Sequence, residues 1–276
     1  MRRISSLLLL LAAACGRQSS GTLEGVLPPA ELEPVAAPEP AEAPEPAEAP
    51  EPQIAVEPIV VDLPGGEQQI QFLPVPRPDG SEFWIARTET TWDVFDLFFL
   101  RPDEEAEVDG ITGPSKSVFP VTRGFGHDGM PALGMTFPSA LAFCDWLNSK
   151  GLPYVFRLPT VDEWRLAAGA APADWDAAAW HAGNADGKPR EVGGKAANAF
   201  GLYDMAGNVA EWVTSEEEQP LALGGSWLQE PPELGRDARM QYDLSWQQRD
   251  PQWPKSVWWM ADAGWVGFRL VLEERP

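Results

Sequence analysis

Cysteine and histidine, the residues found most often in nucleophilic and transition-metal sites, are scarce in this chain. Its 276 residues include two cysteines, Cys15 and Cys144, and two histidines, His127 and His181. Two cysteines cannot form a four-cysteine zinc site or a disulfide framework. The histidines lie far apart in loop-like sequence, so we expect no shared role for them. The composition therefore argues against most classes of metalloenzyme.

Other reactive side chains also lack suitable neighbours in the sequence. Ser226 lies in the segment GGSW, which does not have the GxSxG pattern of a serine nucleophile. The acidic run 103–105 is typical of a solvated loop. Cys144 stands between apolar residues in AFCDW, which favours a buried core thiol over a reactive one. No nucleophile paired with a base is indicated.

Charge excludes a further class of function. The chain has 20 Lys and Arg against 42 Asp and Glu, for a formal net charge of −22. A surface this acidic repels the phosphate backbone, so nucleic acid is not an expected partner.

The N-terminus predicts export. Residues 1–15 read MRRISSLLLLLAAAC, two arginines followed by an apolar run too short to span a membrane, which is a signal-peptide layout. Small residues ending at Cys15 resemble the lipobox of bacterial lipoproteins, which implies an acylated cysteine and a lipid anchor in the cell envelope. Gly16 after this cysteine favours the outer membrane or the periplasmic face. An ordinary signal peptide with a chance cysteine is the alternative.

Residues 16–58 predict a disordered linker. They are rich in Pro, Glu and Ala, and APEPAE at 37–42 is repeated at 43–48. Proline-rich chain extends by about 3.1 Å per residue, so residues 21–58 alone could hold a domain up to roughly 100 Å from a membrane. The folded domain is expected at 59–276.

Local patterns within 59–276 predict few and short elements. Helices are expected from Thr90 or Thr91 to Pro102, from Pro138 to Gly151, and from a capping box at Thr160 to Gly169. Strands are expected at 69–75, 83–87, 211–214 and 266–272. The rest is dense in Gly, Pro, Asn, Asp and Trp. This pattern indicates a loop-rich α+β domain.

Six segments together resemble the sulfatase-modifying-factor, or formylglycine-generating-enzyme-like, family. In order they are FWIARTETTWDVFDLF (83–98), MPALGMTFPSALAFCDWL (130–147), RLPTVDEWRLAA (157–168), NAFGLYDMAGNVAEW (198–212), LGGSW (223–227) and VGFRLV (266–271). The segment 250–259, DPQWPKSVWW, resembles the variety found in planctomycete-type bacteria. The resemblance implies a variant of the C-type-lectin fold.

The resemblance also implies a particular reaction and a particular metal. The family's enzymes oxidise a sulfatase cysteine to formylglycine with copper held by two cysteines between the GGSW and GFR motifs. In this chain residues 224–269 contain no cysteine, so no copper site is expected. The related iron-dependent sulfoxide synthases use histidines of an additional helical domain. No such helical domain is expected in this chain, so no iron is expected.

A calcium site is implied by four matching positions, Asp204, Gly207, Val209 and Glu211, where family members combine carboxylates with backbone carbonyls. The alternative is structural. Asp204 and Asn208 would then shape the turn, while Glu211 pairs with a buried arginine, either Arg239 or Arg269.

Aromatic residues crowd the C-terminal third, where the family builds its substrate groove. Core packing explains most of them, whereas one or two on a groove floor would bind a peptide or sugar ring. The candidate groove residues are Trp227, Arg239, Trp246, Trp258, Trp259 and Trp265.

The sequence therefore favours a membrane-tethered binding or scaffold module of the cell envelope, without the copper-dependent oxidase chemistry. Its partners would be the membrane, through the lipid anchor, and an envelope protein or glycan. A formylglycine-generating oxidoreductase and an envelope regulator of a cell-wall or polysaccharide enzyme are the alternatives.

Overall fold

The computed structural model describes residues 57–100, 114 and 122–275. The predicted signal segment, Cys15, nearly all of the predicted linker and the acidic run 103–105 lie outside the described residues. The described residues belong to one unit, residues 48–276.

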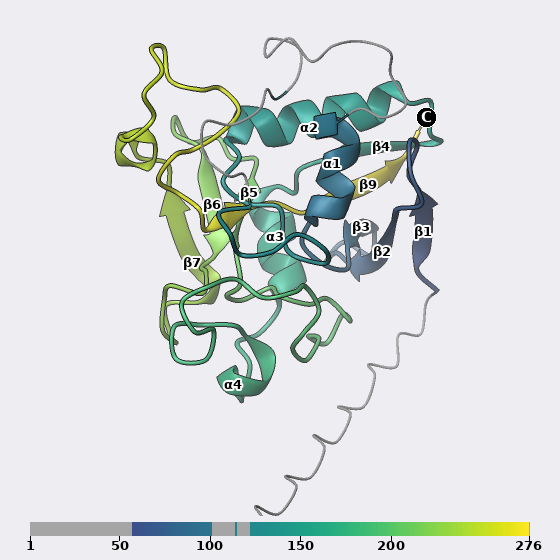
Figure 1. Ribbon diagram of the computed structural model, residues 1–276. Coiled ribbons are helices and arrows are strands. Elements are labelled where there is room, and N and C mark those ends of the chain that lie inside the picture. Colours follow the sequence, from purple (N-terminus) through teal and green to yellow (C-terminus); the bar gives the residue numbers. More distant parts are fainter. Residues whose placement is uncertain (1–56, 101–113, 115–121, 276) are drawn as a thin grey trace, which may run out of the picture. The chain divides into compact units, whose positions relative to one another are not determined.

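A five-stranded antiparallel sheet in the order β1-β2-β3-β9-β4 forms one half of the fold (Figure 1). The C-terminal strand β9 lies between β3 and β4, so the end of the chain is held inside this sheet. The bounds are β1 Ile59–Asp62, β2 Gln69–Pro76, β3 Glu82–Ala86, β4 Tyr154–Arg157 and β9 Val271–Glu274.

A second sheet has the order β7-β6-β5-β8 and carries the turn in which calcium ligands were predicted. Strands β5 and β6 are buried along their whole length, and β5 pairs in parallel with the two-residue strand β8. The bounds are β5 Ala210–Val213, β6 Leu221–Gly224, β7 Gly235–Gln241 and β8 Val266–Gly267.

Three helices begin at or next to the predicted positions. Thr136 caps α2, and Thr160 with Glu163 forms the expected capping box of α3. The sequence did not predict α4, which Asp174 caps, or the 3-10 helix η1. The bounds are α1 Trp92–Leu100, α2 Phe137–Ser149, α3 Val161–Ala168, α4 Trp175–Ala178 and η1 Leu244–Gln247.

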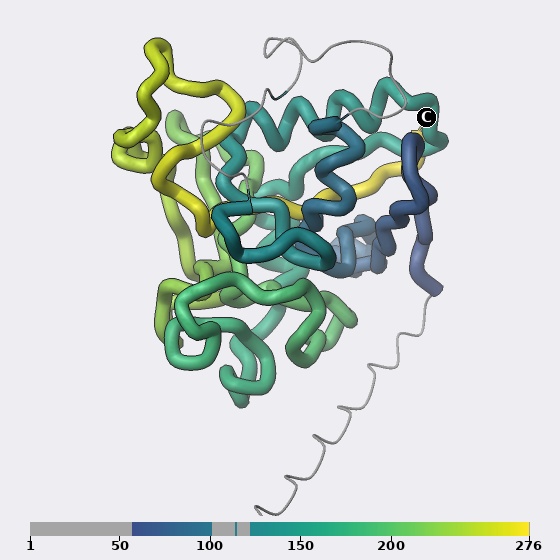
Figure 2. The backbone as a smooth tube through the Cα atoms, in the orientation of Figure 1, coloured from purple at the N-terminus to yellow at the C-terminus, as the bar shows by residue number. Residues whose placement is uncertain are grey.

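The core joins α1 and α2 to the centre of the molecule through aromatic rings. Phe95 of α1 stacks on Phe143 of α2 with ring centroids 5.5 Å apart, and Phe143 contacts Phe268 at 5.5 Å. Burial of large aromatic surfaces of this kind is the main stabilising contribution to such a core. Around it run long loops, including the green segment after α4 and the yellow segment before β8 (Figure 2). None of the described helices has the length and apolar character needed to cross a membrane.

The α+β class with few short helices and strands is confirmed, and two local predictions need correction. The strand expected at 266–272 is two strands, β8 and β9, which belong to different sheets. Between them Phe268, Arg269 and Leu270 are buried, and the arginine turns its guanidinium to a partner in the interior. In the sequence, Leu141 forms an apolar stripe with Ala140, Phe143, Cys144 and Leu147, which predicts a buried side chain, but Leu141 is exposed on α2.

Candidate functional site: a buried acidic turn

Left-handed backbone defines the turn between Tyr203 and β5. Asp204 has φ 56° and Asn208 has φ 47°, a conformation that Asp and Asn tolerate better than other side chains. Gly207 has φ 78°, and a Cβ at this position would lie 2.1 Å from the carbonyl oxygen of Trp180. Only glycine fits there. The sequence DMAGN therefore forms this turn by its own conformational preferences.

Glu211 forms a buried ion pair with Arg269. Its Oε1 accepts from Nη2 of Arg269 at 2.6 Å, and its Oε2 accepts from Nε at 2.6 Å. The same Oε2 also accepts from the indole Nε1 of Trp164 at 2.7 Å. Both residues of the ion pair are fully buried. Of the two arginines considered from the sequence, Arg269 is therefore the partner.

Arg239, the other candidate, lies on β7 and makes an exposed ion pair. Its Nη2 lies 2.6 Å from Oε1 of Glu217, and the two side chains are 47% and 37% exposed. A pair of this kind contributes little to stability, because water screens it.

Glu89 is a functional candidate that sequence reasoning missed. It is buried beyond the end of β3 and accepts hydrogen bonds from Nδ2 of Asn208 at 2.7 Å and from the backbone N–H of Val209 at 2.9 Å. Asn208 in turn accepts from the backbone N–H of Arg190 at 2.9 Å. The segment TETT, in which Glu89 lies, has no local feature that separates it from a surface loop. Only the fold brings it to the turn.

At this turn three buried carboxylates, those of Glu89, Asp204 and Glu211, therefore lie around the guanidinium of Arg269. Burial raises the pKa of Glu89 well above its ordinary value, and the charges of Asp204 and Glu211 add to the effect. Burial also raises the pKa of Asp204 to about 6. Arg269 compensates one of the three negative charges. Protons or a further cation are needed to compensate the other two negative charges.

The predicted calcium ligands fit a cation only in part. Oδ2 of Asp204 accepts from the backbone N–H of Gly193 at 2.7 Å, while its buried Oδ1 has no hydrogen-bond partner. This orphan oxygen and the turn carbonyls suit a hard cation. Glu211 does not, because Arg269 and Trp164 already engage both of its oxygens. Among the described residues, the ligand oxygens of Glu89, Asp204 and Glu211 do not gather into one group within 4.8 Å.

The predicted groove aromatics lie mainly in the core. Trp227, Trp258 and Trp259 are buried, and Trp259 packs against Phe95 and Phe99 of α1. Trp246 and Trp265 are half-buried, and their ring centroids are 6.0 Å apart. Both belong to an aromatic row that also includes Trp212 and Tyr242. Core packing therefore accounts for the three buried tryptophans. A ligand-binding role for any of the six residues stays a prediction.

An apolar groove of about 300 Å³ lies next to this aromatic row, and the sequence did not predict it. Its lining includes Phe137, Pro138, Pro220, Tyr242, Gln247 and Val257. Aromatic rings and prolines combined with a few polar side chains, among them the amides of Gln219 and Gln247, are typical of a surface that accepts a peptide or a sugar ring.

The thiol and hydroxyl considered as nucleophiles are both structural. Cys144 is buried in α2, and burial raises the pKa of its thiol well above the ordinary value, so it stays protonated. The predicted core role of Cys144 is confirmed. Ser226 is buried, and its hydroxyl donates to Oε1 of Gln229 at 2.9 Å.

Residues 46–274 match the family model described as the sulfatase-modifying factor enzyme 1-like domain. The chain belongs to this family, as its motifs predicted.

Solved structures agree on the fold. Treponema denticola variable protein 1 superposes with a TM-score of 0.53 at 20% identity, and PvdO from Pseudomonas aeruginosa with 0.52 at 19%. Each match covers 79% of this chain and all of the other.

Two relatives match over shorter stretches. Chaperone protein LppX from Paenibacillus barcinonensis is 31% identical over 108 residues, covering 26% of this chain and 39% of that protein. Serine/threonine-protein kinase pkn1 from Chlamydia pneumoniae is 33% identical over 96 residues, covering 32% of this chain and 14% of the kinase. The chain thus spans well under half the length of either relative.

Proposed function

We propose that this chain is a membrane-tethered binding or scaffold module of the cell envelope, and that it does not perform copper-dependent cysteine oxidation. One observation carries the second part. The stretch between Gly224 and Arg269, where family enzymes hold copper with two cysteines, contains no cysteine. Thiolates are the ligands that soft Cu(I) prefers, and the Asp, Ser and Gln side chains of this stretch are hard or weak ligands.

The two cysteines elsewhere in the chain do not supply a replacement. Cys144 is buried and its thiol is protonated, so it is neither a ligand nor a nucleophile as it stands. Cys15 is the predicted acylation site, and acylation would consume its thiol. A copper pair would therefore need two thiolates that this chain does not offer.

The apolar groove supports the binding part of the proposal. Its rings and prolines, with Gln247 and Lys255 also in the lining, would accept a peptide segment or a glycan of an envelope partner. A relative named as a chaperone supports a protein partner, although the match covers only about a quarter of this chain.

Incubation with a sulfatase-motif cysteine peptide tests the proposal. With the full chain, copper and oxygen supplied, we expect no conversion of the peptide cysteine to the aldehyde above a no-protein control, as measured by mass spectrometry. A family enzyme that has both cysteines serves as the positive control. Appearance of the formylglycine mass shift with this chain would make the oxidoreductase alternative the better one.

We also propose a calcium ion at the turn, held by Asp204 and backbone carbonyls rather than by Glu211. A calcium ion there would coordinate the orphan Oδ1 and compensate the two excess negative charges. A chelator should then lower the melting temperature of the wild type, and added calcium should restore it. Asp204→Asn should melt at the same temperature with and without chelator. A wild-type melting temperature that ignores both chelator and calcium would mean that a proton satisfies Asp204 instead.

A further inference from the structure

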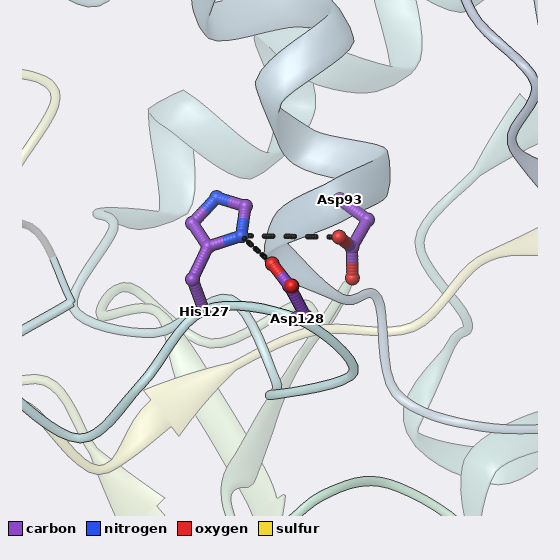
Figure 3. A group of neighbouring side chains, drawn as sticks. All are labelled: Asp93, His127 and Asp128. Atoms are coloured by element: carbon purple, nitrogen blue, oxygen red, sulfur yellow. Dashed lines mark hydrogen bonds and ion pairs between the residues drawn. The ribbon is translucent and has the colours of Figure 1, made fainter.

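A second group of polar side chains lies beside the first helical turn of α1. In the sequence it is far from the acidic turn at 204–208. Asp93 comes from α1, and His127 and Asp128 come from the loop that leads to Met130 (Figure 3). One ligand atom from each of the three lies within 4.8 Å of the others. Within the described part of the chain, this is the one group of three or more such residues with that geometry.

The two carboxylates face the same ring nitrogen of His127. Nδ1 lies 2.9 Å from Oδ1 of Asp128 and 3.8 Å from Oδ1 of Asp93. For metal–ligand bonds of about 2.0–2.2 Å in tetrahedral geometry, neighbouring ligand atoms are separated by about 3.4 Å. The two observed separations lie on either side of that value, so a small rotation of the exposed Asp128 would complete the arrangement.

The other ring nitrogen of His127, Nε2, is positioned by a third carboxylate. Nε2 of His127 lies 3.0 Å from Oδ2 of Asp96, one turn further along α1. A carboxylate that accepts from one imidazole N–H leaves the lone pair on the opposite nitrogen, and this is how proteins orient metal-ligating histidines. Asp93 is oriented similarly, because its Oδ2 accepts from the backbone N–H of Gly129 at 2.8 Å.

His181 shows a different arrangement of carboxylates around a histidine of the same molecule. Its Nε2 lies 2.8 Å from Asp176 and its Nδ1 lies 3.2 Å from Glu230. The two carboxylates therefore occupy opposite edges of the ring and cannot share one ion with it. At His127, by contrast, two carboxylates converge on one edge and a third supports the other.

We propose that Asp93, His127 and Asp128 bind one divalent transition-metal ion of the Zn²⁺ type, with Asp96 as the residue that positions His127. An imidazole nitrogen with two carboxylates suits Zn²⁺ or its first-row neighbours better than Ca²⁺ or Mg²⁺, which prefer oxygen ligands alone. His127 is 40% exposed and Asp128 is 96% exposed, so water would complete the coordination. The ion would link the loop 122–130 to the start of α1.

Zinc titration of the full chain tests this inference. All proteins carry Cys15→Ser, so that a thiol there cannot bind the ion. Calorimetry should show one Zn²⁺ per chain, and His127→Gln and Asp93→Asn should each weaken binding at least about 10-fold. Asp128→Asn should do the same without disturbing the fold, because this side chain is almost fully exposed. Asp96→Asn should weaken binding by about 10-fold to 100-fold, as expected of a positioning residue.

His181→Gln is the matched control and should bind zinc as the wild type does. Cobalt gives a second readout, because Co²⁺ in the site should show visible absorption bands that zinc abolishes. Absence of stoichiometric zinc uptake, or equal uptake by wild type and His127→Gln, would overturn the proposal. In that case His127 would be an imidazolium that is ion-paired with Asp93, Asp96 and Asp128.

Discussion

Replacing Arg269 with methionine should lower the free energy of unfolding by about 3–5 kcal/mol, because it leaves buried Glu211 without its cation. The loss is large for a domain whose total stability is of the order of 5–15 kcal/mol. Glu89 and Asp204 would share the effect, since the charge of Arg269 also favours their ionised forms. Urea denaturation followed by tryptophan fluorescence measures the change in the free energy of unfolding.

Arg239→Met is the matched control for this substitution. It removes the same side chain from an ion pair with Glu217 that is about half exposed, so we expect a loss of about 0–1 kcal/mol. The double variant Glu211→Gln with Arg269→Met should be less destabilised than the sum of the two single variants. If Arg269→Met and Arg239→Met have the same free energy of unfolding, the buried pair of Glu211 and Arg269 does not stabilise the fold as its geometry indicates.

Replacing Cys15 with serine should abolish lipid labelling and release the protein from the membrane. A hydroxyl does not replace the thiol as acyl acceptor, and each buried methylene of an acyl chain contributes about 0.8 kcal/mol to membrane binding. Cells grown with labelled fatty acid should therefore show label in the wild type and none in Cys15→Ser. Fractionation should move the variant from the membrane pellet to the soluble fraction.

Cys144→Ser provides the control, because it removes a thiol that is buried in α2 and cannot be acylated in the folded protein. It should remain labelled and membrane-bound. Equal labelling of wild type and Cys15→Ser, or no label in either, would eliminate the lipoprotein interpretation and leave an ordinary signal peptide.

Local signals in the sequence were sufficient for the class, the family and several boundaries. The capping box at Thr160 predicted the start of α3, because its hydrogen bonds join residues only three apart. Glycine and asparagine in DMAGN predicted a turn through their tolerance of positive φ. The absence of cysteine between Gly224 and Arg269 is a property of composition and needs no structure. The strands β1, β4, β6 and β7 were missed. Strand β6, for example, is buried along its whole length and so shows no alternation of apolar and polar residues.

Only the tertiary structure decided which side chains meet. Glu89 bonds to Asn208 across 119 positions, and Arg269 to Glu211 across 58. His127 reaches Asp96 across 31. Nothing near these residues in the sequence distinguishes the buried Glu89 from an exposed glutamate, or Arg269 from Arg239 as the partner of Glu211. Hydrogen bonds and ion pairs act over about 3–4 Å in space, whatever the separation along the chain. The partners were therefore fixed by the order of strands in two sheets and by the packing of α1 on α2, which no local pattern encodes.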